Sequence, residues 1–85
     1  MSAEEPQRLK RPLYPMPEFV HQALLRQGLM AAYHSRPPYQ QNDYIGWITR
    51  TKRQVTQHKR LNQMLNELTR GDSYMNMVWR PGRPR

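Results

Sequence analysis

The sequence has 85 residues and no cysteine, and its fourteen Lys and Arg residues against six Asp and Glu residues give a net charge of +8. A chain of this length forms one domain, which buries only about 60% of the surface that the unfolded chain exposes. The lack of cysteine excludes a disulfide framework, a thiolate zinc site and a cysteine nucleophile. The positive charge predicts attraction to polyanions, such as nucleic acid, anionic lipid or acidic protein surfaces.

The N-terminal third predicts an extended arm followed by two short helices. Residues 1–15 contain prolines among charged residues and have no sustained apolar period, which is typical of an extended segment. Pro17 suits the first position of a helix, and Glu18 suits the positive end of the helix dipole. Gly28 predicts a break before a second helical stretch at residues 29–35.

Two longer helices are predicted by apolar residues spaced i, i+3, i+4 and i+7, which fall on one helix face. The first covers roughly residues 39–53, and the second ends at Arg70, before the typical helix-ending residue Gly71. Residues 52–55 allow only a sharp connection, so the two apolar stripes should pack together as a helical hairpin. The stripes are Tyr44, Trp47, Ile48 and Thr51, and Leu61, Met64, Leu65 and Leu68.

The predicted fold class is all-α, a small bundle of three to four helices. We expect an extended arm at residues 1–15, a helical domain at residues 16–71, and a tail at residues 72–85 that is partly packed and then basic and flexible. The N-terminus has no secretory signal pattern, and no apolar run approaches the ~20 residues of a membrane span, so we expect a cytoplasmic protein. Four tail residues should lie across the helices: Tyr74, Met75, Met77 and Trp79.

Several short motifs follow one another in a specific order along the helical region. They are Tyr44-Ile45-Gly46-Trp47-Ile48, Lys52-Arg53, Thr56, Arg60-Leu61 and Met64-Leu65. Together they resemble the C-terminal helical segment of the bacterial YdeI/OmpD-associated family, whose members are also labelled bacteriocin-protection proteins. The resemblance begins near Pro17, includes Pro37-Pro38, and closes with Gly71 and Tyr74-Met75, so it covers most of the chain outside the arm and the tail.

The resemblance implies a bacterial protein connected with protection against cationic antimicrobial peptides or bacteriocins, through a protein partner such as a porin. It implies no reaction and no catalytic residues. Thr51, Gln54 and Gln57 depart from the family pattern, which usually has alanine, proline and arginine at these positions. Longer members carry an additional N-terminal α/β domain, so we expect this chain to act as a stand-alone helical module.

Residues 44–66 contain five basic residues and no acidic residue, with Asp43 and Glu67 just outside this segment. A solvated face of a basic protein and an anion-binding surface both fit this pattern. If the chain bound nucleic acid, the cations would contact phosphates. The sequence contains no signal for base-specific readout. The candidate site residues are Arg50, Lys52, Arg53, Lys59 and Arg60.

Other kinds of site fit the sequence less well. A helix-turn-helix or membrane-surface role would need the apolar stripe of residues 54–70, which the core requires. The three histidines, His21, His34 and His58, lie in different elements without ligand spacing, so we expect no metal site and no cofactor. No nucleophile motif is present, so we expect no catalytic residue. The sequence therefore predicts a non-catalytic interaction module, with nucleic-acid binding as the alternative.

Trp47 lies in the middle of its stripe, which predicts a central core residue rather than a ligand platform. On that basis, Trp47→Ala should lower the free energy of unfolding by about 3–5 kcal/mol, the range for a buried aromatic side chain. Chemical denaturation measures this loss. An unchanged stability would show that Trp47 is not a core residue.

Overall fold

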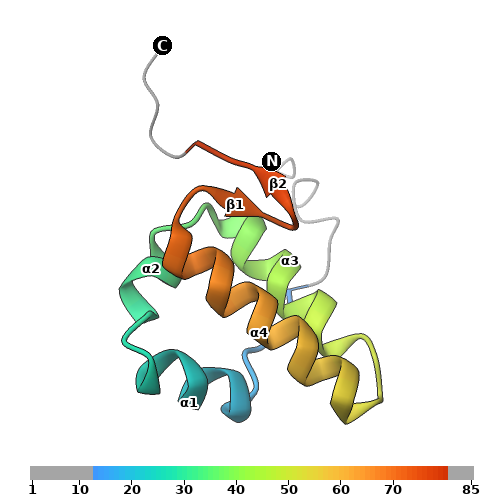
Figure 1. Ribbon diagram of the computed structural model, residues 1–85. Helices are drawn as coiled ribbons and strands as arrows, with labels where there is room; N and C mark the ends of the chain where they lie inside the picture. The colour runs from blue at the N-terminus through green and yellow to red at the C-terminus, as the bar shows by residue number, and fades with distance from the viewer. Residues whose placement is uncertain (1–12, 81–85) are drawn as a thin grey trace, which may run out of the picture.

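A computed structural model describes residues 13–80, which form four helices followed by a short β hairpin (Figure 1). The predicted predominance of helix is confirmed, but the fold is not purely all-α. Residues 1–12 and 81–85 lie outside the described residues, and with them most of the predicted arm and the end of the predicted tail. The elements are α1 (Glu18–Arg26), α2 (Met30–His34), α3 (Pro38–Thr49), α4 (Gln54–Arg70), β1 (Ser73–Tyr74) and β2 (Met77–Val78).

The β hairpin is the element that the all-α prediction missed. Its two strands pair antiparallel, with Tyr74 opposite Met77. The turn residues Met75 and Asn76 have φ angles of 52° and 65°. Positive φ at both central residues is typical of a type I′ turn, which usually contains Asn-Gly or a similar pair. Met75 does not fit that sequence signature. Strands of two residues are also too short to show alternation of apolar and polar residues, so the sequence contains no clear signal for the hairpin.

The helix boundaries follow local signals in the sequence. Gly28 and Gly71 have φ angles of 68° and 81°, in the left-handed region that favours glycine, and they mark the ends of α1 and α4. The helix predicted to reach residue 53 ends earlier, at Thr49. In the connection that follows, the Arg53 N–H donates to Thr51 Oγ1, a local hydrogen bond of the kind that competes with helical bonding.

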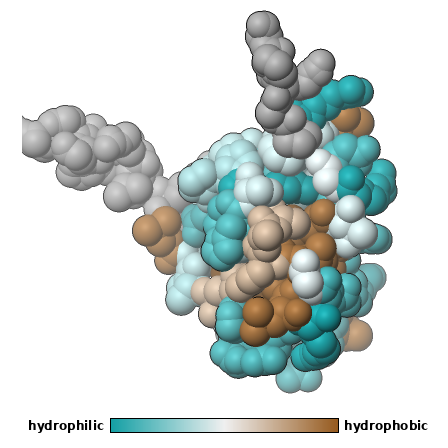
Figure 2. Space-filling model, turned by 90° about the vertical axis from the view of Figure 1, so that its left-hand side faces the viewer, coloured by the Kyte–Doolittle hydropathy of each residue, from teal (hydrophilic) through white to brown (hydrophobic). Residues whose placement is uncertain are grey.

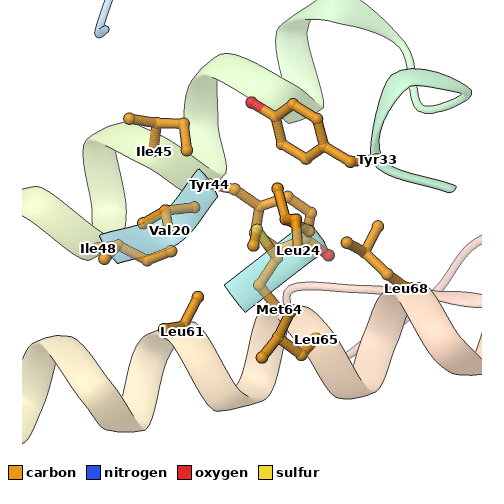
Figure 3. Packing of buried hydrophobic residues seen from close by; sticks show 10 residues of the cluster. All are labelled: Val20, Leu24, Tyr33, Tyr44, Ile45, Ile48, Leu61, Met64, Leu65 and Leu68. Carbon is orange, nitrogen blue, oxygen red and sulfur yellow. The ribbon is translucent and has the colours of Figure 1, made fainter. Parts of the chain in front are cut away.

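The hydrophobic core lies where all four helices meet (Figure 3). The stripe predicted on α4 is confirmed, because all four of its members are buried. The helix pair α3 and α4 contributes most of the cluster, while α1 and α2 close it on the remaining sides. The buried apolar residues are Val20, Leu24, Tyr33, Tyr44, Ile45, Ile48, Leu61, Met64, Leu65 and Leu68.

The placement of Trp47 at the centre of the core is wrong. Its side chain is only partly buried and packs against the cluster from outside, whereas Tyr44 and Ile48 are fully enclosed. Ile45, outside the predicted stripe, is buried, because Val20 of α1 packs on that side of α3 (Figure 3). We therefore expect Trp47→Ala to cost less than the ~3–5 kcal/mol of a fully buried aromatic residue.

The segment before α1 is anchored on α3, although it falls within the predicted arm. The Tyr14 N–H donates to Asn42 Oδ1 over 2.8 Å. The Tyr14 ring packs on Gly46, where an added Cβ would lie 2.6 Å from Tyr14 Cε2. Glycine at this position thus makes room for an aromatic ring from a segment distant in sequence.

Ile48→Ala tests the assignment of the core. The change removes a side chain with 0% exposure, so we expect a loss of about 2–5 kcal/mol in the free energy of unfolding. Val55→Ala, at a position 61% exposed on α4, is the control and should change stability by less than about 0.5 kcal/mol. Urea denaturation measures both. Equal losses in the two variants would contradict the core described above.

Candidate anion-binding site

One face of α4 forms a polar surface distinct from its buried stripe. Thr56, Lys59, Arg60 and Gln63 are spaced i, i+3, i+4 and i+7, so they lie on one side of the helix. Trp47 of α3 stands opposite them. These five residues line a surface depression of about 320 Å³, which we call the Trp47 pocket. Its lining combines an aromatic ring, two cations, a hydroxyl and an amide.

Arg60 is held in place against Trp47. Its Nη1 donates to the Trp47 carbonyl oxygen over 2.6 Å, and its guanidinium carbon lies 5.3 Å from the centre of the Trp47 ring. A cation over an aromatic face at this distance is attracted by the ring quadrupole. The guanidinium has five N–H donors in a planar fork, so the bond to Trp47 leaves donors for a ligand. Arg60 is thus a cation whose orientation is already fixed.

The five predicted cations occupy two neighbouring regions. Arg50, Lys52 and Arg53 lie in the connection between α3 and α4, and all three are exposed. Lys59 is exposed and Arg60 half-buried on the first half of α4, where the structure brings them together in the Trp47 pocket. Arg50, Lys52 and Arg53 are not among the residues that line the pocket, so the structure brings only two of the five cations together there.

The basic surface keeps its positive charge in the folded chain. Within residues 13–80, no carboxylate lies within ion-pair distance of any of the five predicted cations. Glu67, the acidic residue nearest to them along α4, is 3% exposed and contacts other groups. Charges that lie close together without counter-ions attract anions, and this attraction weakens as salt rises.

The sequence-based search missed a buried polar network around Glu67. The Glu67 carboxylate accepts a hydrogen bond from the Tyr44 hydroxyl and one from Gln63 Nε2 at 3.1 Å. It also accepts hydrogen bonds from the backbone N–H groups of Met75 and Asn76, each at 2.8 Å. One buried carboxylate therefore joins α3, α4 and the turn of the β hairpin.

Arg36 completes this network from the segment after α2. Arg36 is 3% exposed, and its guanidinium donates to Gln40 Oε1 at 3.1 Å and to the Glu67 carbonyl oxygen at 3.0 Å. The Trp79 ring covers it, with the guanidinium carbon 4.4 Å from the ring centre. A buried guanidinium needs such partners, because desolvation of an unpaired charge is costly. The polar groups here hold the hairpin and the end of α4 together.

The network shifts the pKa values of both its acidic members. Burial by itself raises the pKa of Glu67, but hydrogen bonds from Tyr44, Asn76, Met75 and Gln63 outweigh burial and hold that pKa below the usual 4.5. Burial, reinforced by the hydrogen bond to the Glu67 carboxylate, raises the pKa of Tyr44 well above 10.0. Glu67 is therefore ionised and Tyr44 protonated at neutral pH.

Helical spacing contained a signal for the buried Glu67 network and for the polar face that lines the Trp47 pocket. Glu67 follows Met64 by three positions and precedes Leu68, which places it at the edge of the apolar stripe. A carboxylate at such an edge is close enough to the core to be buried, and a buried carboxylate requires hydrogen-bond donors. Thr56 and Gln63 share a face with Lys59 and Arg60 through the same spacing, and this pattern was available from the sequence.

The described residues hold neither a metal-binding cluster nor a membrane-spanning helix. Residues 13–80 contain no cluster of three or more histidine, aspartate or glutamate side chains able to hold a metal ion. The His58 ring packs edge-on against Phe19, and His34 does so against Tyr33. In the same part of the chain, no helix is both long and apolar enough to span a bilayer.

The helical domain matches a known protein family. The family described as "Bacteriocin-protection, YdeI or OmpD-Associated" matches residues 14–71. The chain belongs to this family. The matched region begins at Tyr14, which packs on α3, and ends at Gly71, which terminates α4, so it contains all four helices. No curated protein and no solved structure matches the chain.

The YdeI/OmpD-associated family match supports the resemblance seen in the sequence motifs. The family description names bacteriocin protection and association with OmpD, and nothing in it supports the nucleic-acid alternative. The β hairpin, which packs on α4, lies just beyond the matched residues. The Trp47 pocket lies wholly within them.

Glu67→Gln tests the buried network. A glutamine keeps the shape but replaces one acceptor oxygen by an NH₂ group facing other donors, so we expect a loss of about 1–3 kcal/mol in stability at neutral pH. The folded-state pKa of Glu67 lies below 4.5, so its contribution is complete above about that pH and disappears as the pH falls through the lowered value.

Urea denaturation at neutral pH and at a pH well below 4.5 measures this effect. The stability difference between the wild type and Glu67→Gln should shrink in acid. Asp72→Asn, at a carboxylate whose side chain is 67% exposed, is the control. A difference that stays constant with pH would contradict the role of the ionised Glu67 carboxylate.

Proposed function

We propose that this protein is a non-catalytic interaction module in bacterial protection against bacteriocins or cationic antimicrobial peptides. The observation that carries the proposal is the family match over residues 14–71. The proposed partner is a protein, as the OmpD association in the family description suggests, and we place the module in the cytoplasm. The proposed contact surface is the set of cations Arg50, Lys52, Arg53, Lys59 and Arg60.

The charge of this surface supports a partner with an acidic face. Five cations lie on α4 and on the connection that precedes it, and no carboxylate of the described part of the chain forms an ion pair with them. Complementary charge accelerates encounter between proteins and discriminates against partners of the wrong sign. A partner that presents acidic side chains at similar spacing would therefore bind here in preference to a neutral or basic one.

The helical scaffold supports binding without large rearrangement. The Trp47 pocket rests on α3 and α4, which pack against each other through the central core (Figures 1 and 3). Side chains presented by packed helices are positioned more rigidly than those on long loops, so less conformational entropy is lost when a partner binds. Such a surface suits a docking role, and it needs no chemical step.

A genetic experiment tests the proposed function. Deletion of the gene in the source bacterium should increase sensitivity to a bacteriocin or a cationic peptide, because the protective interaction is removed. The wild-type gene should restore resistance. The growth-inhibitory concentration measures both effects. Unchanged sensitivity after deletion would contradict the proposal.

Complementation with charge variants tests the contact surface. The triple variant Arg50→Gln, Lys52→Gln and Arg53→Gln removes three exposed cations from the connection between α3 and α4 and should restore resistance only partly. The matched control replaces three exposed cations elsewhere and should restore it fully: Arg26→Gln, Arg70→Gln and Arg80→Gln. Equal loss in both triple variants would show that net charge alone matters, and it would contradict the assigned surface.

A further inference from the structure

The Trp47 pocket differs from the rest of the basic surface in shape and in chemistry. It is a depression of about 320 Å³, at the lower end of the ~300–1,000 Å³ range of small-ligand sites. Lys59, Arg60 and Trp47 all line it, and the Arg60 guanidinium lies over the Trp47 ring. The connection residues, by contrast, are exposed cations, and within residues 13–80 none of them lies over an aromatic ring.

We infer that the Trp47 pocket binds a carboxylate side chain of an acidic peptide segment, with Arg60 and Lys59 as the anion contacts and Trp47 as an apolar wall. This inference rests on the proposed function, since it identifies the part of the basic surface that recognises the partner. The ligand is a glutamate or aspartate next to an apolar residue in an exposed stretch of a partner protein.

Arg60 supplies the main contact with the carboxylate. A guanidinium pairs with a carboxylate through two parallel N–H···O bonds, which gives both strength and direction. The 2.6 Å bond to the Trp47 carbonyl oxygen fixes the side chain before a ligand arrives. Because this orientation is already set, binding does not lose the rotamer entropy of a free arginine.

Lys59 and Thr56 extend the polar side of the pocket. Lys59 is exposed and adds a second positive charge one residue from Arg60, and Thr56 lies one turn earlier on the same face. Gln63 closes the other end, where its Nε2 is bound to the Glu67 carboxylate. That bond directs the amide donor of Gln63 towards the buried network, so the pocket's positive charge comes from Lys59 and Arg60.

The Trp47 ring explains why a peptide fits better than a free inorganic anion. Phosphate would use the two cations but would add no apolar contact to the half-buried indole. An acidic residue beside an apolar one satisfies both sides, because aromatic side chains contribute large apolar contact areas at interfaces. The depression is also small and lies on one helix pair, whereas single-stranded nucleic acid is usually bound along an extended groove.

Binding of a defined peptide tests the inference. The probe is a blocked peptide of alternating glutamate and leucine, and its control is the same peptide with glutamine in place of glutamate. NMR titration of the labelled protein follows the indole N–H signals of Trp47 and Trp79. We expect the acidic peptide to shift the Trp47 signal and not the Trp79 signal, with an affinity that falls as salt rises.

Three variants locate the contact. Arg60→Gln should weaken peptide binding about tenfold or more, the loss expected when one partner of a charge-assisted pair is removed. Lys59→Gln, at an exposed position that should leave the fold unchanged, should weaken it by a smaller factor. Arg26→Gln on α1, outside the pocket, should change the affinity less than twofold, which is under about 0.4 kcal/mol.

Several outcomes would overturn the inference. They are equal binding of the glutamine peptide, unchanged affinity in both Lys59→Gln and Arg60→Gln, and tighter binding of inorganic phosphate or of an oligonucleotide than of the acidic peptide. If the acidic peptide fails to bind while deletion still sensitises the bacterium, the pocket assignment is contradicted and the proposed function is not. If the peptide binds as expected while deletion has no effect, the proposed function is contradicted and the pocket assignment is supported.

Discussion

The buried Glu67 carboxylate is the constraint on which the C-terminal half of the structure depends. It lies in the apolar stripe of α4, where an unpaired charge would be strongly destabilising. Four donors satisfy it, from α3, from α4 itself and from the turn between β1 and β2. The turn amides come from Met75 and Asn76, which both have positive φ, so the carboxylate also offsets the conformational cost of that turn.

Arg36 and Trp79 place a second buried charge beside this carboxylate. Arg36 donates to the backbone carbonyl oxygen of Glu67 and not to its carboxylate. The guanidinium and the carboxylate therefore lie near each other without forming a direct ion pair. Trp79 covers the guanidinium from the strand side. The hairpin is thereby attached to the rest of the domain through its turn and through the residue after β2, and the Tyr74 hydroxyl of β1 adds a hydrogen bond to Asp43 of α3. This attachment, rather than the two-residue strands, stabilises the hairpin.

Helix α4 separates structural and binding roles by face. Its apolar stripe and Glu67 hold the core and the hairpin, while Thr56, Lys59, Arg60 and Gln63 lie on another face and line the Trp47 pocket. Gln63 touches both regions, because it lines the pocket and donates to Glu67. Apolar side chains are also exposed over the α1 and α2 side of the molecule (Figure 2).

The sequence by itself determined the helices, the α4 stripe and the position of the cations. These follow from short-range rules: 3.6-residue periodicity, glycine and proline at helix ends, and an acid-free stretch between Asp43 and Glu67. The family motifs were also readable, because their order is a property of the chain alone. In α3, periodicity selected Tyr44 and Ile48 correctly but selected Trp47, whereas Ile45 is the third buried residue.

Only the tertiary structure decided which surfaces those helices cover. Val20 of α1 packs beside Ile45 and leaves Trp47 at the edge, where its ring becomes a wall of the pocket. The hairpin also depends on tertiary contacts, since its turn amides bind a carboxylate that precedes them by eight and nine residues. Periodicity assigns residues to helix faces, whereas burial depends on which other element lies against each face. That choice is made by packing and by hydrogen bonds between residues distant in sequence.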